Sequence, residues 1–200
     1  LFQMVGAKRS EKAQHRTIKR LAKRYEVDSK QAERVRDTAL YFYHQVKVEW
    51  QIEAQKYHDL LAWSALLHEI GLFIGYEKNH RHAAYLIKHS DMAGFSKLQQ
   101  LQLSFLLSNQ RKSIKTDLLD AVSVSKKIKL IHVAKLLRLA KRIHYNRANK
   151  MIPKIALLAD QTSLTINFPD QWLSDHALVC AGLRREKEDW WKMGHDLNFE

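Results

Sequence analysis

Apolar residues recur at spacings of three and four along most of the first 150 residues, and this period limits the possible folds more than any other feature. One series runs through Val35, Ala39, Phe42, Val46 and Trp50, which together form one face of an amphipathic helix. Similar series predict helices over residues 16–25, 57–70, 80–89, 96–110 and 125–149. We therefore expect a mainly α fold.

Helix ends are marked by residue type. Asp28 stands three residues before Gln31, and Ser96 stands three residues before Gln99, so both pairs match the capping box that begins a helix. Gly71 predicts the end of the helix over residues 57–70, because glycine is common just beyond a helix C-terminus.

The pattern changes after Pro153. Residues 154–158 and 163–168 are rich in apolar and β-branched residues and flank a short polar turn, which predicts a β-hairpin. Residues 170–193 predict a helix, and residues 196–200 predict a last short strand. The sequence therefore predicts a large helical domain over residues 1–150 and a small α+β subdomain over residues 151–200.

Positive charge is concentrated in one stretch of the chain. The net charge is +13, and residues 111–154 alone carry thirteen Lys or Arg against two Asp. Such an excess attracts anions, and nucleic acid, anionic lipid and polyphosphate are all candidates. The alternative is a solvated basic face on a core helix. The stretch has few of the acidic i,i+4 partners that usually accompany exposed lysines.

Several classes of protein are disfavoured. No apolar run approaches the ~20 residues that cross a bilayer, and the start of the sequence does not resemble a signal peptide. The single cysteine, Cys180, fits a reducing compartment. The six glycines form no phosphate-binding loop. We expect a cytoplasmic protein with no transmembrane segment, and a chain that does not catalyse hydrolysis alone.

The pair His68 and Glu69 ends a predicted helix, and His80 and His82 follow it. This arrangement resembles the HD superfamily of metal-dependent phosphohydrolases, in which a His-Asp pair and a later Asp bind a divalent metal that activates water. Here Glu69 replaces the Asp, and Lys141 stands where the later carboxylate is expected. Because an ammonium group has no lone pair and repels a metal, we expect no metal. We interpret His68 and Glu69 as a hydrogen-bonded pair in a degenerate site.

Blocks along the whole chain resemble the C-terminal half of the exopolyphosphatase/guanosine pentaphosphatase family. They lie at residues 1–6, 28–35, 67–72, 80–86, 90–95, 136–140 and 168–173. The resemblance implies an HD-domain-like helical bundle with a small α+β appendix. It also implies a parent enzyme that removes terminal phosphate from inorganic polyphosphate, or the 5′ γ-phosphate from guanosine pentaphosphate (pppGpp). In the family that chemistry belongs to N-terminal actin-like domains that hold Mg²⁺, and we expect those domains to be absent from this chain.

The resemblance further implies that this region binds the anionic chain, packs on its own N-terminal catalytic domains and forms a homodimer, with no cofactor of its own. Residues 43–53 look more like the pentaphosphatase branch, and residues 111–115 look more like the exopolyphosphatase branch. Arginine holds phosphate oxygens bidentately and lysine acts as a point charge. The candidate polyphosphate-binding residues are His80, Arg81, His82, Arg111, Lys112, Lys115, Arg138, Lys141 and Arg142.

Other interpretations stay open. His82 is equally consistent with a packed histidine, and Arg138 with a salt bridge to an acidic residue such as Glu69. A nucleic-acid-binding module fits the charge, although the aromatic residues lie at core spacings and not within the basic stretch. A structural dimerisation module fits every feature. An active HD hydrolase fits His68 but not Lys141.

Overall fold

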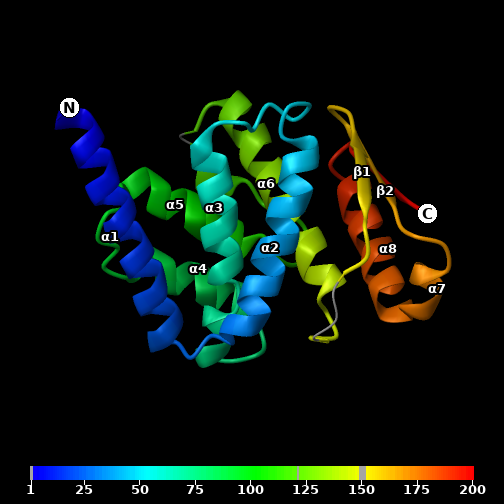
Figure 1. Cartoon of the computed structure of the whole chain (residues 1–200), viewed down its shortest axis with the longest axis horizontal. Coiled ribbons are helices and arrows are strands. Elements are labelled where there is room, and N and C mark those ends of the chain that lie inside the picture. Colours follow the sequence, from blue (N-terminus) through cyan, green and yellow to red (C-terminus); the bar gives the residue numbers. More distant parts are fainter. Residues whose placement is uncertain (1, 121, 149–151) are drawn as a thin grey trace.

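The computed structural model describes residues 2–120, 122–148 and 152–200, with side chains from Ser10 onward. The first part is a helical bundle (Figure 1). Its elements are α1 (Phe2–Arg24), α2 (Ser29–Val46), α3 (Gln55–Leu66), η1 (Ile70–Phe73), α4 (Asn79–His89), α5 (Lys97–Ser108), η2 (Asp117–Leu119) and α6 (Val124–Ile143). The prediction of a mainly α fold is confirmed.

Some predicted bounds are wrong. Helix α1 begins well before residue 16, and α6 ends at Ile143 and not at residue 149, which lies outside the described residues. The helix predicted to reach residue 70 ends at Leu66, and Gly71 lies within η1. A Cβ on Gly71 would lie 1.9 Å from the carbonyl oxygen of Asn79. Gly71 is therefore explained by the close approach of η1 to the start of α4.

The two predicted helix caps differ. Ser96 and Gln99 form the full capping box at the start of α5. Asp28 accepts a hydrogen bond from the backbone N–H of Gln31 at 3.1 Å, but the Gln31 side chain donates to the carbonyl of His144 at 2.9 Å. Half of the second box is thus replaced by a tertiary contact between α2 and the end of α6.

The C-terminal part is a three-stranded sheet with two helices. Strand β1 (Ala156–Ala159) pairs antiparallel with β2 (Ser163–Asn167), and β2 pairs parallel with β3 (Asp196–Phe199). The predicted hairpin and last strand are confirmed. The helix predicted over residues 170–193 is divided into α7 (Trp172–Asp175) and α8 (Ala177–Trp191), because His176 leaves the helical conformation at φ −124° and ψ 57°.

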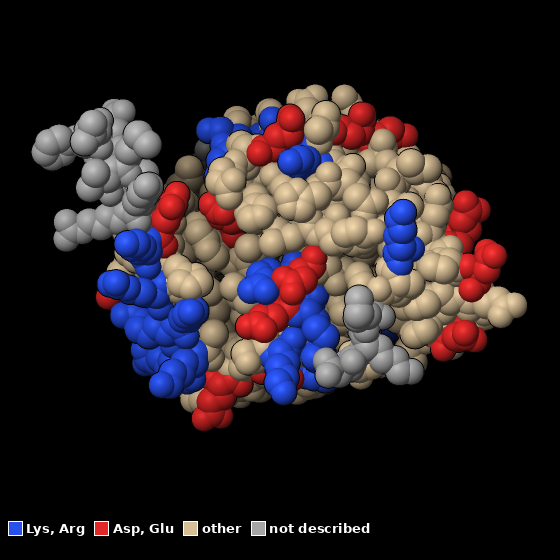
Figure 2. Space-filling view, in the orientation of Figure 1, with Lys and Arg blue, Asp and Glu red and all other residues tan. Residues whose placement is uncertain are grey.

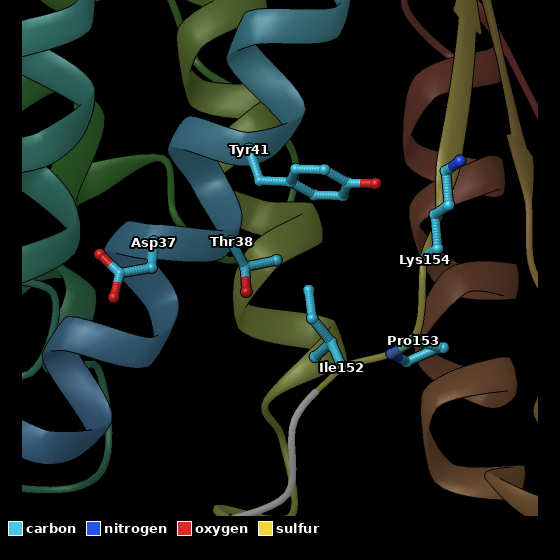
Figure 3. A pocket seen from close by; sticks show the side chains of 6 residues that line it. All are labelled: Asp37, Thr38, Tyr41, Ile152, Pro153 and Lys154. Carbon is cyan, nitrogen blue, oxygen red and sulfur yellow. The ribbon is translucent and has the colours of Figure 1, made fainter.

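This appendix packs on α2. The Tyr41 hydroxyl donates to the carbonyl of Ile155 at 2.8 Å, and the Trp50 indole N–H donates to the carbonyl of Asp160 at 2.8 Å. Figure 3 shows Tyr41 directed from α2 toward residues 152–154, beside a cavity of about 360 Å³. Buried residues of both parts form one continuous core. The domain boundary predicted at residues 150 and 151 falls outside the described residues and stays a prediction.

Helix α6 lies between the bundle and the appendix, packing on α2, α3, α5 and α8. Its basic residues are therefore not all on a solvated face. Lys135 is 0% exposed and Arg138 is 1% exposed, because α8 covers the side of α6 that the sequence alone leaves open.

Exposed positive charge also gathers on α1. Figure 2 shows Lys and Arg side chains over the lower part of this helix. The exposed bases there are Lys12, Arg16, Lys19, Arg20, Lys23 and Arg24.

Among the described residues, no helix combines the length and the apolar character that a membrane span requires.

Candidate functional site

The loop over residues 109–115, which follows α5, carries three of the predicted phosphate-binding residues. Asn109 closes this loop: its side-chain N–H donates to the carbonyl of Lys115 at 3.0 Å, and its side-chain oxygen accepts from the Lys115 N–H at 2.7 Å. Arg111, Lys112 and Lys115 are all exposed. A short loop pinned at both ends thus presents three cations to solvent.

The buried guanidinium of Arg138 binds the backbone of this 109–115 loop. Its Nη1 donates to the carbonyl oxygens of Asn109, at 3.0 Å, and of Lys112. Lys112 has φ +65°, a left-handed conformation that costs about 1–2 kcal/mol for a residue with a Cβ. The contacts from Arg138 offset that cost and hold the loop in its cation-presenting shape.

The charge of Arg138 is balanced within the chain. Its Nε donates to Glu186 Oε2 at 2.6 Å, and its Nη2 donates to Asp189 Oδ2 at 2.9 Å. Arg142 binds the other Glu186 oxygen at 2.9 Å. An acidic partner for Arg138 was one of the expected alternatives, but its suggested identity, Glu69, is wrong. With its donors committed in this way, Arg138 acts here as a positioning residue.

Two cavities flank the 109–115 loop and share Arg111 and Lys112. The smaller, of about 200 Å³, is also lined by His80, Arg81 and Lys115. The larger, of about 470 Å³, we call the basic cavity. It is lined by Tyr76, Asn79, Gln110, Arg111, Lys112, Arg138, Lys141, Arg142, Tyr145, Arg185, Glu188 and Asp189. Apart from His82, which is half-buried and lines neither cavity, every predicted binding residue is brought to this region.

Seven residues of the basic cavity were not predicted: Tyr76, Asn79, Gln110, Tyr145, Arg185, Glu188 and Asp189. Arg185 is exposed, and its side chain has no polar partner among the described residues. Tyr76 and Tyr145 are 74% and 57% exposed. Arg185 lies on α8, far along the chain from the basic stretch, so only the packing of α8 on α6 places it beside Arg142.

Burial shifts the titration of two cavity residues. The pKa of His80 falls to about 4, first because the ring is buried and then because of Arg111 and Lys112. Burial, followed by the charges of Arg142 and Arg138, lowers the pKa of Lys141 to about 7. The Lys141 ammonium donates to the backbone and side-chain oxygens of Gln110. A bound anion would favour its charged form.

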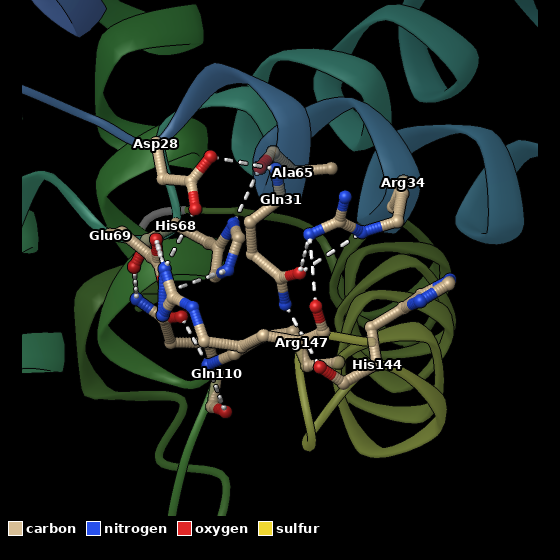
Figure 4. Close-up of polar contacts among 10 residues, drawn as sticks. Asp28, Gln31, Arg34, Ala65, His68, Glu69, Gln110, His144 and Arg147 are labelled. Atoms are coloured by element: carbon tan, nitrogen blue, oxygen red, sulfur yellow. Dashed lines mark hydrogen bonds and ion pairs between the residues drawn. The ribbon is translucent and has the colours of Figure 1, made fainter. Parts of the chain in front are cut away.

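The degenerate site around His68 lies near the ends of α3 and α6 (Figure 4). His68 Nδ1 donates to the carbonyl of Ala65 at 2.7 Å, and burial lowers the pKa of His68 to about 3. Its Nε2 lies 3.7 Å from Glu69, too far for a hydrogen bond. Glu69 instead binds Arg147 bidentately at 2.8 and 2.9 Å. The prediction of a His68–Glu69 hydrogen bond is therefore wrong.

The metal of the HD superfamily does not fit these residues. Both carboxylate oxygens of Glu69 are engaged by Arg147, which also contacts Asp28 at 3.3 Å. Lys141 and Arg147 place positive charge beside His68. Among the described parts of the chain, no group of three or more His, Cys, Asp or Glu is arranged to hold a metal ion. The guanidinium of Arg147 supplies the cation that links Glu69 to Asp28.

Comparison with known proteins agrees with the resemblance noted in the sequence. Residues 13–187 match the model of the Ppx/GppA phosphatase family, domain III. A guanosine-5′-triphosphate,3′-diphosphate pyrophosphatase of Aeromonas hydrophila subsp. hydrophila is 38% identical over 97% of this chain. The protein of the same name from Aeromonas salmonicida is 36% identical over the same share. The chain spans 39% of the length of each of these two relatives. The chain therefore belongs to the Ppx/GppA phosphatase family and matches its domain III.

Proposed function

We propose that this chain is the anion-binding C-terminal region of a phosphohydrolase that acts on guanosine pentaphosphate. The observation that carries the proposal is the basic cavity, in which Arg111, Lys112 and Arg185 have exposed side chains without polar partners among the described residues. Charge-assisted hydrogen bonds from such groups bind phosphate oxygens, and release of counterions adds to the affinity.

Two features favour a nucleotide over a plain phosphate chain. The relatives described above carry names that specify a guanosine nucleotide. In addition, Tyr76 and Tyr145 expose their rings beside the cations. An exposed tyrosine offers a surface on which a base stacks, with a contribution of about 1–3 kcal/mol. The cavity therefore combines a place for a base with places for phosphates.

Inorganic polyphosphate is the second candidate. Its support is that the two cavities share Arg111 and Lys112. Together they extend the row of cations from Arg81 and Lys115 on one side of the loop to Arg185 on the other. A linear anion longer than one nucleotide would be needed to contact both cavities at once.

The remaining parts of the proposal concern the whole protein. We propose that the hydrolytic chemistry and its Mg²⁺ belong to N-terminal domains outside this chain, that this region packs on those domains, and that it contributes to a homodimer in the cytoplasm. Sedimentation of the purified chain tests the dimer directly, since a single monomeric species at micromolar concentration would contradict it.

The binding proposal is tested by competition. Guanosine pentaphosphate, inorganic polyphosphate and duplex DNA compete for the chain at one salt concentration, and we expect the nucleotide to displace the others. Tyr145→Ser should weaken binding of the nucleotide about 5- to 150-fold and leave binding of polyphosphate unchanged, because only the base stacks.

Two neighbouring arginines of α8 give a matched control. Arg185→Gln should weaken both phosphate ligands about 5-fold. Arg184→Gln should change neither, since Arg184 is also exposed but does not line the basic cavity. Preference for DNA over both phosphate ligands would reject the proposal and favour a nucleic-acid-binding module.

A further inference from the structure

Another cavity, of about 330 Å³, lies where the helical bundle meets the β appendix. It shares no lining residue with the two cavities beside the 109–115 loop. Its polar lining comes from the segment between α2 and α3, the first half of α6, the β1–β2 turn and the residue before β3. These residues are Glu49, Gln51, Ser125, Lys129, His132, Gln161, Thr162 and His195, so the carboxylate of the exposed Glu49 also lines the cavity.

A buried lysine without a counterion lies behind this junction cavity. Lys135 is 0% exposed, and its Nζ is 2.7 Å from His195 Nδ1 and 4.2 Å above the Trp190 ring. No carboxylate pairs with it among the described residues. A buried ammonium without an anionic partner is unfavourable, and burial lowers the pKa of Lys135 to about 7.

His195 connects this lysine to the junction cavity. When the ammonium of Lys135 donates to Nδ1 of His195, the neutral imidazole must carry its own proton on Nε2. That N–H has no hydrogen-bond acceptor within the described parts of the chain. Since His195 lines the cavity, its free donor is available to an acceptor there.

His132 is the second unsatisfied group. The residue is only 3% exposed and stacks on Trp50 at a centroid distance of 4.3 Å, yet its Nδ1 has no hydrogen-bond partner in the described structure. Buried ring nitrogens are normally paired, and leaving one unpaired costs about 1–3 kcal/mol. An unpaired histidine lining a cavity indicates that a polar ligand completes the site.

We propose that the junction cavity is a binding site for a single phosphate group, either free orthophosphate or the end of a phosphate ester. Lys129 and the Nε2–H of His195 would donate to its oxygens, with the charge of Lys135 behind them, whereas the Thr162 hydroxyl already donates to Asp160 Oδ1 at 3.3 Å. A hydrogenphosphate also has one O–H and several acceptor oxygens, so it satisfies His132 in either tautomer. The proposal stands independently of the function proposed for the basic cavity.

Ligand binding at this position would join the two parts of the chain. The donors come from α6 on one side and from the appendix on the other. A ligand that binds the folded state alone raises stability in proportion to the logarithm of its concentration over its dissociation constant. Phosphate should therefore raise the melting temperature of this chain more than an equal ionic strength of chloride does.

The junction site is tested by titrating the 200-residue chain with inorganic phosphate and following the imidazole signals by NMR. We expect the signals of His132 and His195 to shift and saturate, while those of exposed His15 and His89 do not. A parallel titration with guanosine pentaphosphate distinguishes free phosphate from a phosphate ester. Absence of a saturable shift at both His132 and His195 with either ligand would overturn the proposal.

Variants then separate the site from a general charge effect. Lys129→Gln should weaken phosphate binding about 5-fold, the equivalent of one lost hydrogen bond. Lys126→Gln should leave the affinity unchanged, because Lys126 is exposed on the same helix but does not line the cavity. Lys135→Met should weaken phosphate at least as much as Lys129→Gln. Equal effects of Lys126→Gln and Lys129→Gln would reject the site.

Discussion

Replacing Arg138 by methionine should unfold the chain much more easily, although the residue lines the basic cavity. The side chain is 1% exposed and bridges Glu186, Asp189 and two carbonyls of the 109–115 loop. Methionine fills a similar volume but removes every one of these bonds. Removing one partner of a buried ion pair costs about 3–5 kcal/mol, because the remaining charge stays buried. Glu186 keeps Arg142 as a partner, so we expect the lower part of that range.

Urea unfolding followed by circular dichroism measures this loss, and for a chain of this size a loss of about 3–4 kcal/mol lowers the melting temperature by roughly 6–16 °C. Arg185→Met is the matched control: it removes a cation from the same cavity, but from an exposed side chain, and should change stability by less than about 0.5 kcal/mol. A double-mutant cycle with Glu186→Gln should give a coupling energy above about 1 kcal/mol. If Arg138→Met is as stable as Arg185→Met, the interpretation of Arg138 as a positioning residue fails.

Three further predictions concern the pH dependence of stability, the packing of Gly71 and the catalytic activity of the chain alone. His68, His132 and His144 have pKa values of about 3, 3 and 4 when folded, below the unfolded value near 6.5. Unfolding therefore takes up protons below pH 6.5, so the free energy of unfolding should decrease by about 4 kcal/mol for each unit by which the pH is lowered near pH 5. Equal urea midpoints at pH 7.5 and pH 5 would contradict this prediction. Gly71→Ala should cost at least about 1–3 kcal/mol in thermal unfolding through its clash with α4, whereas Gly75→Ala, with open space around it, should not. The chain alone should release no phosphate from guanosine pentaphosphate or polyphosphate with Mg²⁺, and turnover abolished by His68→Ala would revive the HD hydrolase.

Helix periodicity and capping patterns in the sequence predicted the secondary-structure elements better than they predicted which distant residues contact one another. The period of α2 and the capping box at Ser96 depend on residues within a few positions of each other, and both are confirmed. The second half of the Asp28 box failed because Gln31 reaches His144, 113 residues away, and no local pattern contains that contact.

The same limit explains the basic stretch. Because this stretch has few acidic i,i+4 partners, the sequence indicated unpaired cations on α6. In the structure, however, Glu186 and Asp189 of α8 form ion pairs with Arg138. Charge pairing across helices depends on which face each neighbour covers, and helix period alone leaves that undetermined. For Arg111, Lys112 and Lys115 the prediction needed only their position just after the helix predicted over residues 96–110, and the structure places all three on an exposed loop. Their role in binding phosphate stays a prediction.

The most direct test of that role is the affinity of the chain for guanosine pentaphosphate after paired charge reversal, measured calorimetrically at two salt concentrations. Arg111→Glu with Lys112→Glu should weaken binding at least about 10- to 30-fold, since each lost phosphate contact is worth about 1 kcal/mol, and should reduce the salt dependence. Arg184→Glu with Lys187→Glu changes the net charge equally on exposed residues of α8 outside the basic cavity and should have a much smaller effect. Equal weakening by the two pairs would show that the charge acts only as a diffuse field, and would contradict a phosphate site at the 109–115 loop.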